Sequence, residues 1–299
     1  MAGEPSVRRR LVGGALRRYR ENAGYTLEDA ARVLECDRSK ISRIETGQRG
    51  IRPKELRELL AEYGVLAGEQ RALVAIAGRG GPRAWWHRNA GAMSQACLDH
   101  AVLESAAAEI MTYEAQAIPG LLQTDGYARA LAAAEPGYQT DQQREDAVAA
   151  AALRRRALLG GAAGGDPAAP VPAAPPRLAV ILGEGALRQQ VGGPAVMAGQ
   201  LRHLARLGAE NPAVTIQVLP FSAGAHAAAG SGSLTILRFS DAPGLGVVCL
   251  EALSGGVYLD GPDAVARHLR AFELLRAAAL SPADSLRLLR EPEPLGISR

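Results

Sequence analysis

Residues 26–47 have the pattern of two short helices joined by a tight turn. Thr26 is a good N-cap for the first helix, and Asp29, three residues later, completes an approximate capping box. Asp37 is a second N-cap candidate and opens the next helix. The first helix is rich in alanine, so the second helix can pack closely across it. This pattern predicts a small helical bundle in the N-terminal part of the chain.

The second of these helices, expected over residues 38–45, separates into an apolar face and a polar face. Ile41 and Ile44 lie three residues apart, so both face the protein interior. The outer face near the helix start then carries Arg38, Ser39, Lys40 and Arg43. A DNA major groove accepts one helix, whose N-terminal residues reach the base edges, and basic side chains bond guanine or phosphate. The pattern therefore predicts a helix that reads DNA, and the alternative is the solvated face of a small bundle.

Other helices are expected on both sides of this pair. Apolar residues at helical spacing predict a helix over 12–23, closed by Gly24 in a left-handed conformation. A helix over 53–63 would close the small core, and residues 70–77 form one more apolar helix. Glycine and proline then break the pattern at 78–82. We expect a first domain over residues 1–78.

Charge is unevenly distributed along the chain. The 299 residues include 34 Lys and Arg against 31 Asp and Glu, for a net charge of +3. Residues 1–58 hold 14 of the basic and 9 of the acidic residues. A basic first domain on a near-neutral body is expected when only one part of a protein meets phosphate, although a solvated charged surface gives the same count.

The two short helices resemble the phage-repressor-type helix-turn-helix of the xenobiotic-response-element family. By this resemblance the base-contacting side chains are Arg38, Ser39, Lys40 and Arg43. Thr26 would cap its helix beside a DNA phosphate, and Arg20 would form a partly buried salt bridge with Glu45. Leu27 stands where a glutamine is common in the family. The resemblance implies a sequence-specific DNA-binding transcription regulator.

Residues 79–299 are expected to form a second, larger domain. A stretch rich in Ala, Gly and Pro near 160–176 cannot bury a core and predicts a disordered insert. Before it, Leu103, Ala107, Ile110 and Met111 repeat at helical spacing and predict one long helix. After it, the predicted strands are 214–219, 233–239 and 246–252, with an aliphatic run at 178–182 and helices over 196–207 and 265–279. The predicted fold class is α+β, with an all-α helix-turn-helix bundle followed by a mixed helix-and-sheet domain.

Several segments of this second part resemble the C-terminal domain of many actinobacterial regulators that carry the same N-terminal domain. These segments are Trp85-Trp86, Glu104, 118–124, 127–129, 184–188, 200–204 and 214–220. The resemblance covers almost the whole chain outside the insert. It implies an antitoxin-like regulator, often encoded beside a small partner protein that it is thought to bind.

No catalytic, metal or cofactor site is expected. The five histidines are scattered without metal-ligand spacing, and the three cysteines form no paired pattern. Glu184 and Glu251 each adjoin a strand, but nothing in their spacing brings them together. The glycine-rich run 224–232 lacks a phosphate-binding spacing and is expected to be a loop. The chain is therefore expected not to be an enzyme.

Four residues are candidates for a pocket that holds a small molecule or a partner: Trp85, Trp86, Glu184 and His226. The basic run 154–156 ends a helix and is expected to be solvated rather than to form a second DNA contact. No apolar run is long enough to span a membrane, and the N-terminus lacks a signal peptide, so a cytoplasmic protein is expected.

These observations predict a homodimer that binds a pseudo-palindromic double-stranded DNA site, while the C-terminal domain senses a partner protein or an unidentified small-molecule effector. One alternative is an antitoxin-like protein that neutralises a small partner and binds DNA for autoregulation. The other is an enzyme with a DNA-binding head.

Overall fold

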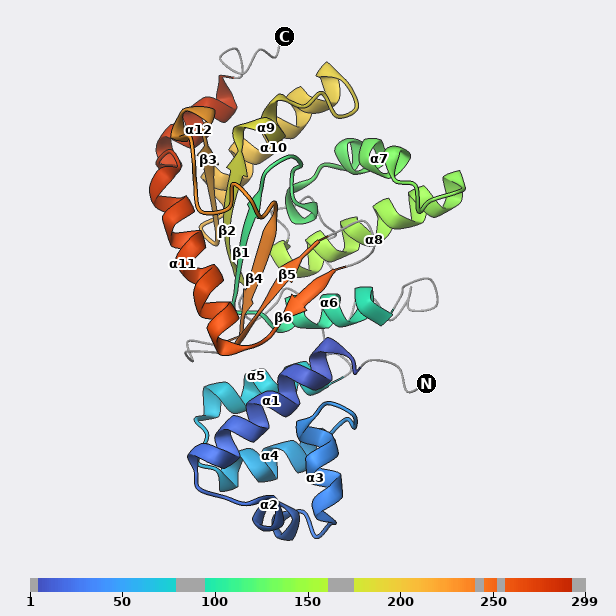
Figure 1. The fold of residues 1–299 in the computed structure, drawn as a ribbon. Helices are drawn as coiled ribbons and strands as arrows, with labels where there is room; N and C mark the ends of the chain where they lie inside the picture. Colours follow the sequence, from blue (N-terminus) through green and yellow to red (C-terminus); the bar gives the residue numbers. More distant parts are fainter. Residues whose placement is uncertain (1–4, 79–94, 161–174, 240–244, 252–255, 292–299) are drawn as a thin grey trace. The chain divides into compact units, whose positions relative to one another are not determined.

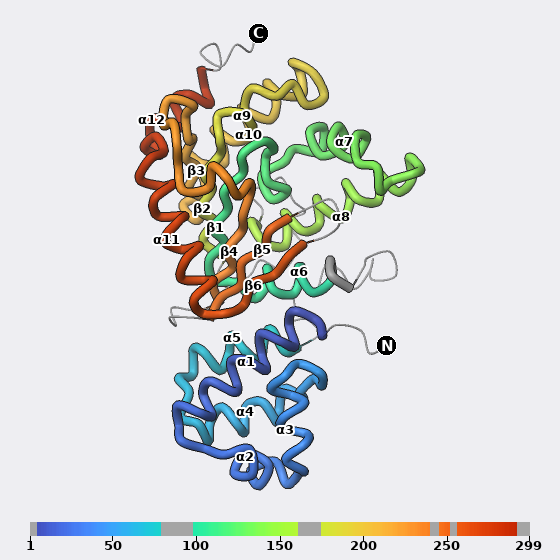
Figure 2. The backbone as a smooth tube through the Cα atoms, in the orientation of Figure 1, coloured from blue at the N-terminus to red at the C-terminus, as the bar shows by residue number. Residues whose placement is uncertain are grey.

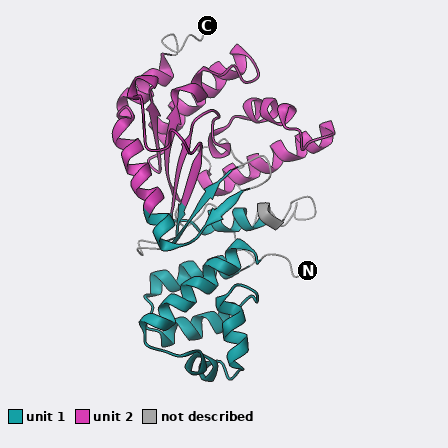
Figure 3. Ribbon diagram, in the orientation of Figure 1, with its two compact units in different colours: residues 1–108, 237–266 teal, residues 109–236, 267–299 magenta. Residues whose placement is uncertain are grey.

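The computed structural model describes residues 5–78, 95–160, 175–239, 245–251 and 256–291. The chain divides into two compact units, residues 1–108 with 237–266 and residues 109–236 with 267–299 (Figure 3). None of the helices in the described ranges has the length and apolar character that a membrane crossing requires. Trp85, Trp86 and most of the insert near 160–176 lie outside the described residues.

Five helices form the N-terminal part of the first unit (Figure 1). They are α1 (Val7–Asn22), α2 (Leu27–Val33), α3 (Arg38–Glu45), α4 (Pro53–Glu62) and α5 (Ala67–Ala77). Their shared core is fully buried and contains Leu11, Leu16, Ile41, Ile44, Leu56, Leu59, Leu60, Leu73 and Ile76. The predicted helical bundle is confirmed, although α1 begins five residues earlier than its apolar pattern indicated.

Local caps set the ends of these helices. Thr26 Oγ1 accepts a hydrogen bond from the amide of Asp29 at 3.1 Å, and the Asp29 carboxylate accepts one from the amide of Thr26 at 2.8 Å. This confirms the capping box. Gly24 has φ +77° and so closes α1 in the left-handed region, as predicted. Asp37 stands at the N-cap of α3, but its side chain makes no capping hydrogen bond within residues 5–78.

The helices α1 and α3 cross at unusually short range. A Cβ atom added to Gly13 would lie 2.3 Å from the carbonyl oxygen of Ile44 and 2.7 Å from that of Glu45. The crossing therefore requires glycine at this point of α1. At Gly14, the next residue, an added Cβ would meet only the end of the Arg18 side chain, at 3.8 Å.

The sheet of the C-terminal part has six strands in the order β3-β2-β1-β4-β5-β6. Its strands are β1 (Glu109–Glu114), β2 (Arg177–Gly183), β3 (Val214–Leu219), β4 (Leu234–Arg238), β5 (Gly246–Leu250) and β6 (Val257–Leu259). β2 runs parallel to both β1 and β3, whereas β5 and β6 are antiparallel. The three parallel strands lie side by side although they are far apart in the sequence (Figure 2). The α+β fold class is confirmed.

The helices of this part are α6 (Gln95–Ala106), α7 (Asp125–Ala134), α8 (Asp141–Leu159), α9 (Glu184–Arg188), α10 (Pro194–Glu210), α11 (Pro262–Ala278) and α12 (Pro282–Arg290). In the second unit, β3 packs against α10 and α12. The amide of Val218 in β3 donates to Ser285 Oγ at 2.9 Å, and its carbonyl accepts from the amide of Leu280 at 2.8 Å. These two bonds cover the edge of the sheet.

The prediction of one long helix through Ile110 and Met111 was wrong. The helix α6 ends at Ala106, and both residues lie in β1, which is buried on both faces. A short apolar run of this kind fits a buried helix and a buried strand equally well. The prediction that the basic run 154–156 is solvated is also wrong for its central residue, because the Arg155 side chain is only 8% exposed.

The first unit extends beyond residue 78, where the sequence placed a domain boundary. Arg8 of α1 donates from Nε to the Asp99 carboxylate of α6 at 2.9 Å and from Nη1 to the carbonyl of Gly78 at 2.8 Å. The Asp99 carboxylate is buried in this contact. Thus α6 packs against α1 and α5.

The short crossing at Gly13 predicts the effect of one added methyl group. We expect Gly13→Ala to lower the free energy of unfolding by about 3 kcal/mol, because the Ile44 and Glu45 carbonyls are backbone atoms that cannot move aside. Gly14→Ala is the matched control and should raise it by up to about 1 kcal/mol, the usual gain for alanine in a helix. Urea unfolding of the full chain followed by circular dichroism measures both, and equal values for the two variants would contradict the close crossing.

Candidate nucleic-acid interface

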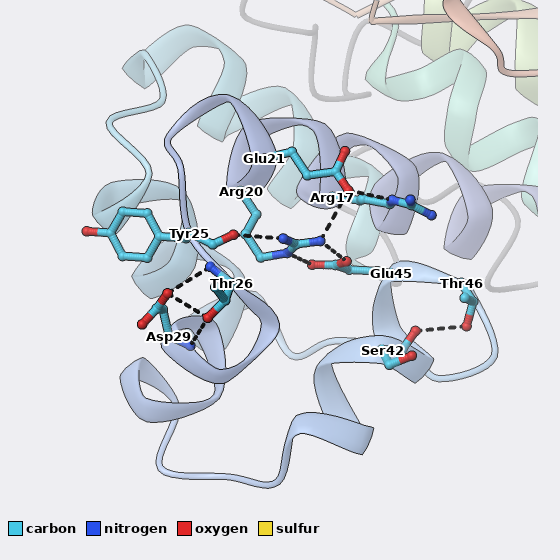
Figure 4. Close-up of polar contacts among 9 residues, drawn as sticks. All are labelled: Arg17, Arg20, Glu21, Tyr25, Thr26, Asp29, Ser42, Glu45 and Thr46. Carbon is cyan, nitrogen blue, oxygen red and sulfur yellow. Dashed lines mark hydrogen bonds and ion pairs between the residues drawn. The ribbon is translucent and has the colours of Figure 1, made fainter.

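A buried ion pair fixes the end of α3 against α1. Arg20 donates from Nε to Oε1 of Glu45 at 2.7 Å and from Nη2 to Oε2 at 2.9 Å (Figure 4). Its Nη1 donates to the carbonyl of Tyr25, in the loop before α2, at 2.8 Å. Arg20 and Glu45 are 7% and 9% exposed, and the hydrogen bonds to Glu45 raise the pKa of the guanidinium. The predicted salt bridge is therefore present, and it ties α1, α3 and the loop before α2 together.

The C-terminal end of α3 is closed by local contacts. Thr46 Oγ1 donates to the carbonyl of Ser42 at 2.9 Å (Figure 4). Gly47 follows with φ +74°, and a Cβ atom added there would lie 3.0 Å from the backbone of Arg10 in α1. The backbone after α3 therefore lies against α1, so both the side chains and the main chain hold α3 in position.

Three of the four predicted base-contacting side chains lie on the exposed face of α3. Arg38, Ser39 and Arg43 are exposed, whereas Ile41 and Ile44 beneath them are buried. Arg43 Nε donates to the carbonyl of Ser39 at 3.2 Å, which holds the guanidinium along the helix surface. This face can present hydrogen-bond donors to an acceptor-rich surface such as the major groove.

Lys40 does not lie on this exposed face, contrary to the expectation. Its ammonium group lies 2.6 Å from Oε1 of Glu55 in α4, and the two side chains are 19% and 25% exposed. The spacing contained the signal, because Lys40 precedes the buried Ile44 by four residues and so shares its side of the helix. Glu55 was not expected from the sequence, since residues that pair across different helices show no periodic pattern.

Other charged residues near α3 were also missed. Glu28 of α2 forms an ion pair with Arg38 at 3.0 Å, and both side chains are exposed. Arg49 and Arg52, in the segment after α3, are exposed as well. The amide of Arg49 donates to the carbonyl of Arg43 at 2.9 Å, so this segment turns back against the end of the helix. The excess of basic residues over residues 1–58 was the only sequence feature that pointed to Arg49 and Arg52.

The C-terminal pocket residues have separate partners. Glu184 begins α9, accepts from the amide of Phe221 at 2.8 Å and pairs with Arg188 at 2.5 Å. The ring of His226 packs edge-on against Tyr113 in β1, with 5.6 Å between ring centroids. Glu251, the other carboxylate considered in the sequence, is exposed just after β5. Trp85 and Trp86 lie outside the described residues, so the pocket stays a prediction.

Comparison with known families assigns both parts of the chain. Residues 11–74 match a family described as a helix-turn-helix domain, which coincides with the interface built above. Residues 98–291, more than half of the chain, match the family described as Domain of unknown function (DUF5753). The chain belongs to the DUF5753 family. Its helix-turn-helix domain supports a DNA-binding regulator of the xenobiotic-response-element type. No curated protein and no solved structure matches the chain.

The Lys40–Glu55 ion pair predicts a pH dependence of stability. The hydrogen bond from Lys40 lowers the pKa of Glu55 below its ordinary value. Such a carboxylate stabilises the fold fully above its unfolded pKa of about 4.3, and this contribution is lost as the pH falls through the lower pKa of the folded state. Glu55→Gln should therefore be less stable than the natural chain near pH 7, and the difference should shrink toward pH 3.

Urea unfolding at several pH values measures this difference. Glu58→Gln is the control, because Glu58 lies on the same helix, its carboxylate is 3.8 Å from Lys54, and its side chain is 45% exposed. If the free energies of unfolding of Glu55→Gln and the natural chain differed by the same amount at every pH, the role assigned to Glu55 would be contradicted.

Proposed function

We propose that this protein is a sequence-specific transcription regulator that binds DNA through the outer face of α3. The observation that carries the proposal is the exposure of Arg38, Ser39 and Arg43 on a helix anchored by Ile41, Ile44 and the Arg20–Glu45 pair. Arg38 and Arg43 would bond guanine or phosphate, and Thr26 would lie beside a phosphate at the start of α2. Lys40 would then act mainly by holding α3 against α4 through Glu55.

We further propose that two copies bind together. One helix-turn-helix domain makes few phosphate contacts and binds weakly at physiological salt, and a two-fold pair would read two half-sites in successive major grooves. In this proposal the DUF5753 domain senses a partner protein or a ligand. It carries out no catalysis, needs no cofactor and acts in the cytoplasm.

Selection of bound duplexes from a random library with the full chain tests the function. The expected product is an inverted repeat whose half-site centres are about 10 base pairs apart. The absence of any enriched sequence, at a salt concentration where the protein is folded, would contradict the proposal. Enrichment of one half-site without its inverted repeat would agree with sequence-specific DNA binding but contradict the proposed dimer.

Arg43→Ala should weaken binding to the selected site by about 1–3 kcal/mol and relax discrimination at one base position. Arg17→Ala is the control, because Arg17 is an exposed arginine on α1 that pairs with Glu21 at 2.8 Å. Fluorescence anisotropy at fixed salt with selected and scrambled duplexes measures both variants. If Arg43→Ala lost affinity equally for both duplexes, Arg43 would contact phosphate rather than a base.

A further inference from the structure

A small cavity lies between the C-terminal half of α11 and the strands β2 and β3. Its volume is about 160 Å³, and all of its lining residues belong to the second unit. A cavity of roughly 150 Å³ is large enough to hold benzene. None of the lining residues belongs to the DNA interface on α3, so the cavity is a separate candidate site.

The pairing of the strands places the lining side chains on one face of the sheet. In the parallel register Ala179 of β2 stands beside Thr215 of β3, and Ile181 stands beside Gln217. Side chains two residues apart in a strand share a face. Phe272 of α11 lines the cavity from the other side, and both Phe272 and Ile181 are buried. Ala179, Ile181 and Phe272 therefore give the cavity an apolar wall.

Gln217 adds a hydrogen-bond acceptor to this wall. Its side chain is buried, and its Nε2 donates to the carbonyl of Leu280 at 2.8 Å and to that of Arg276 at 3.4 Å. These bonds hold the amide group in place. Its Oε1 has no hydrogen-bond partner among the residues that the structure describes. A buried amide oxygen usually accepts a hydrogen bond, and a ligand with an N–H or O–H group would supply one here.

Arg276 brings a guanidinium to the opening of the cavity. The side chain is 52% exposed and pairs with Glu273, three residues earlier in α11. An exposed pair of this kind contributes little to stability, so the guanidinium can exchange Glu273 for the carboxylate of a ligand, whose two oxygens suit it. Arg177 and Glu109 also line the cavity, with 3.9 Å between their charged groups. Charges of both signs at the opening match a zwitterion better than an anion.

We propose that this cavity binds a free α-amino acid with an apolar side chain, such as leucine. The ligand side chain would pack against the apolar wall, its ammonium group would donate to Gln217 Oε1, and its carboxylate would accept from the Arg276 guanidinium. Gln217 bonds to the main chain of Arg276, so the two protein groups are neighbours, as the ammonium and carboxylate groups of an α-amino acid are. The proposal rests on the sensing role proposed for the DUF5753 domain and names the class of its ligand.

L-leucine is the probe, titrated into the full chain without DNA. Calorimetry should show saturable binding with a dissociation constant of about 1 mM or below, and leucine should raise the thermal midpoint. Three related compounds each lack one group: glycine the side chain, 4-methylpentanoate the ammonium group and 3-methylbutylamine the carboxylate. Each should bind about tenfold more weakly or worse. Equal affinity for leucine and any of the three would contradict the amino-acid assignment.

Two variants test the residues. Arg276→Gln should weaken leucine binding about tenfold, as loss of one charge-assisted hydrogen bond implies. Its control is Arg287→Gln, which removes an exposed arginine of α12 that also pairs with a carboxylate three residues earlier, Asp284, at 2.8 Å. This control should bind leucine like the natural chain.

Ala179→Val places two more methyl groups in the cavity and should abolish leucine binding. Without ligand its thermal midpoint should stay the same or rise, because valine suits a strand and fills the space. If this variant fails to fold, Arg276→Gln keeps the proposal testable, since it changes an exposed side chain.

Three results would overturn the proposal. They are the absence of saturable leucine binding up to about 10 mM, equal affinity in Arg276→Gln and Arg287→Gln, and unchanged affinity in a folded Ala179→Val chain. Leucine binding is measured without DNA, so it succeeds or fails independently of the duplex selection that tests the proposed function. A chain that binds leucine but whose DNA affinity leucine leaves unchanged would support the site and contradict the sensing role.

Discussion

The buried ion pair between Arg20 and Glu45 determines where the exposed helix of the N-terminal domain stands. Its two hydrogen bonds join the last turn of α1 to the last residue of α3. A buried pair of this kind gains little over two apolar side chains, but loss of one partner leaves an uncompensated charge and costs several kcal/mol. The main effect of the pair is therefore to fix the position of α3, and its contribution to net stability is small. The close crossing of α1 and α3 at Gly13 depends on the same position of α3.

From this position follows the surface that the domain offers. With Ile41 and Ile44 buried, Arg38, Ser39 and Arg43 are exposed, while Lys40 turns toward Glu55 in α4. Arg38 also has an acidic neighbour, Glu28. Carboxylates this close to the basic face repel the DNA backbone phosphates, and this repulsion lowers the affinity for any DNA sequence. At a specific site the bases can replace the carboxylates as partners of the arginines, so the affinity for that site falls less. The helix-turn-helix domain supports the DNA-binding role, and the sensing role of the DUF5753 domain is our proposal.

Features set by neighbouring residues could be predicted from the sequence, and those set by distant ones could not. The capping box of Thr26 and Asp29 lies within four residues, and the apolar face of α3 lies within a single helix, so both were predicted. The Arg20–Glu45 pair came from family resemblance. By contrast, the need for glycine at position 13 arises from backbone carbonyls of α3, and Glu55 and the buried Arg155 meet partners on other helices. Ile110 was misassigned because a strand buried on both faces has no period of two.

The most direct test of this account is the DNA affinity of Glu45→Gln, measured on the selected duplex and on a scrambled one while circular dichroism shows that the chain is folded. Glu45 is buried and carries no donor that could reach DNA. If the ion pair positions α3, specific affinity should fall about tenfold or more, an energy of about 1.4 kcal/mol, and scrambled-duplex affinity should change little. Unchanged specific affinity in the folded variant would contradict the claim that this pair holds the DNA-binding surface in place.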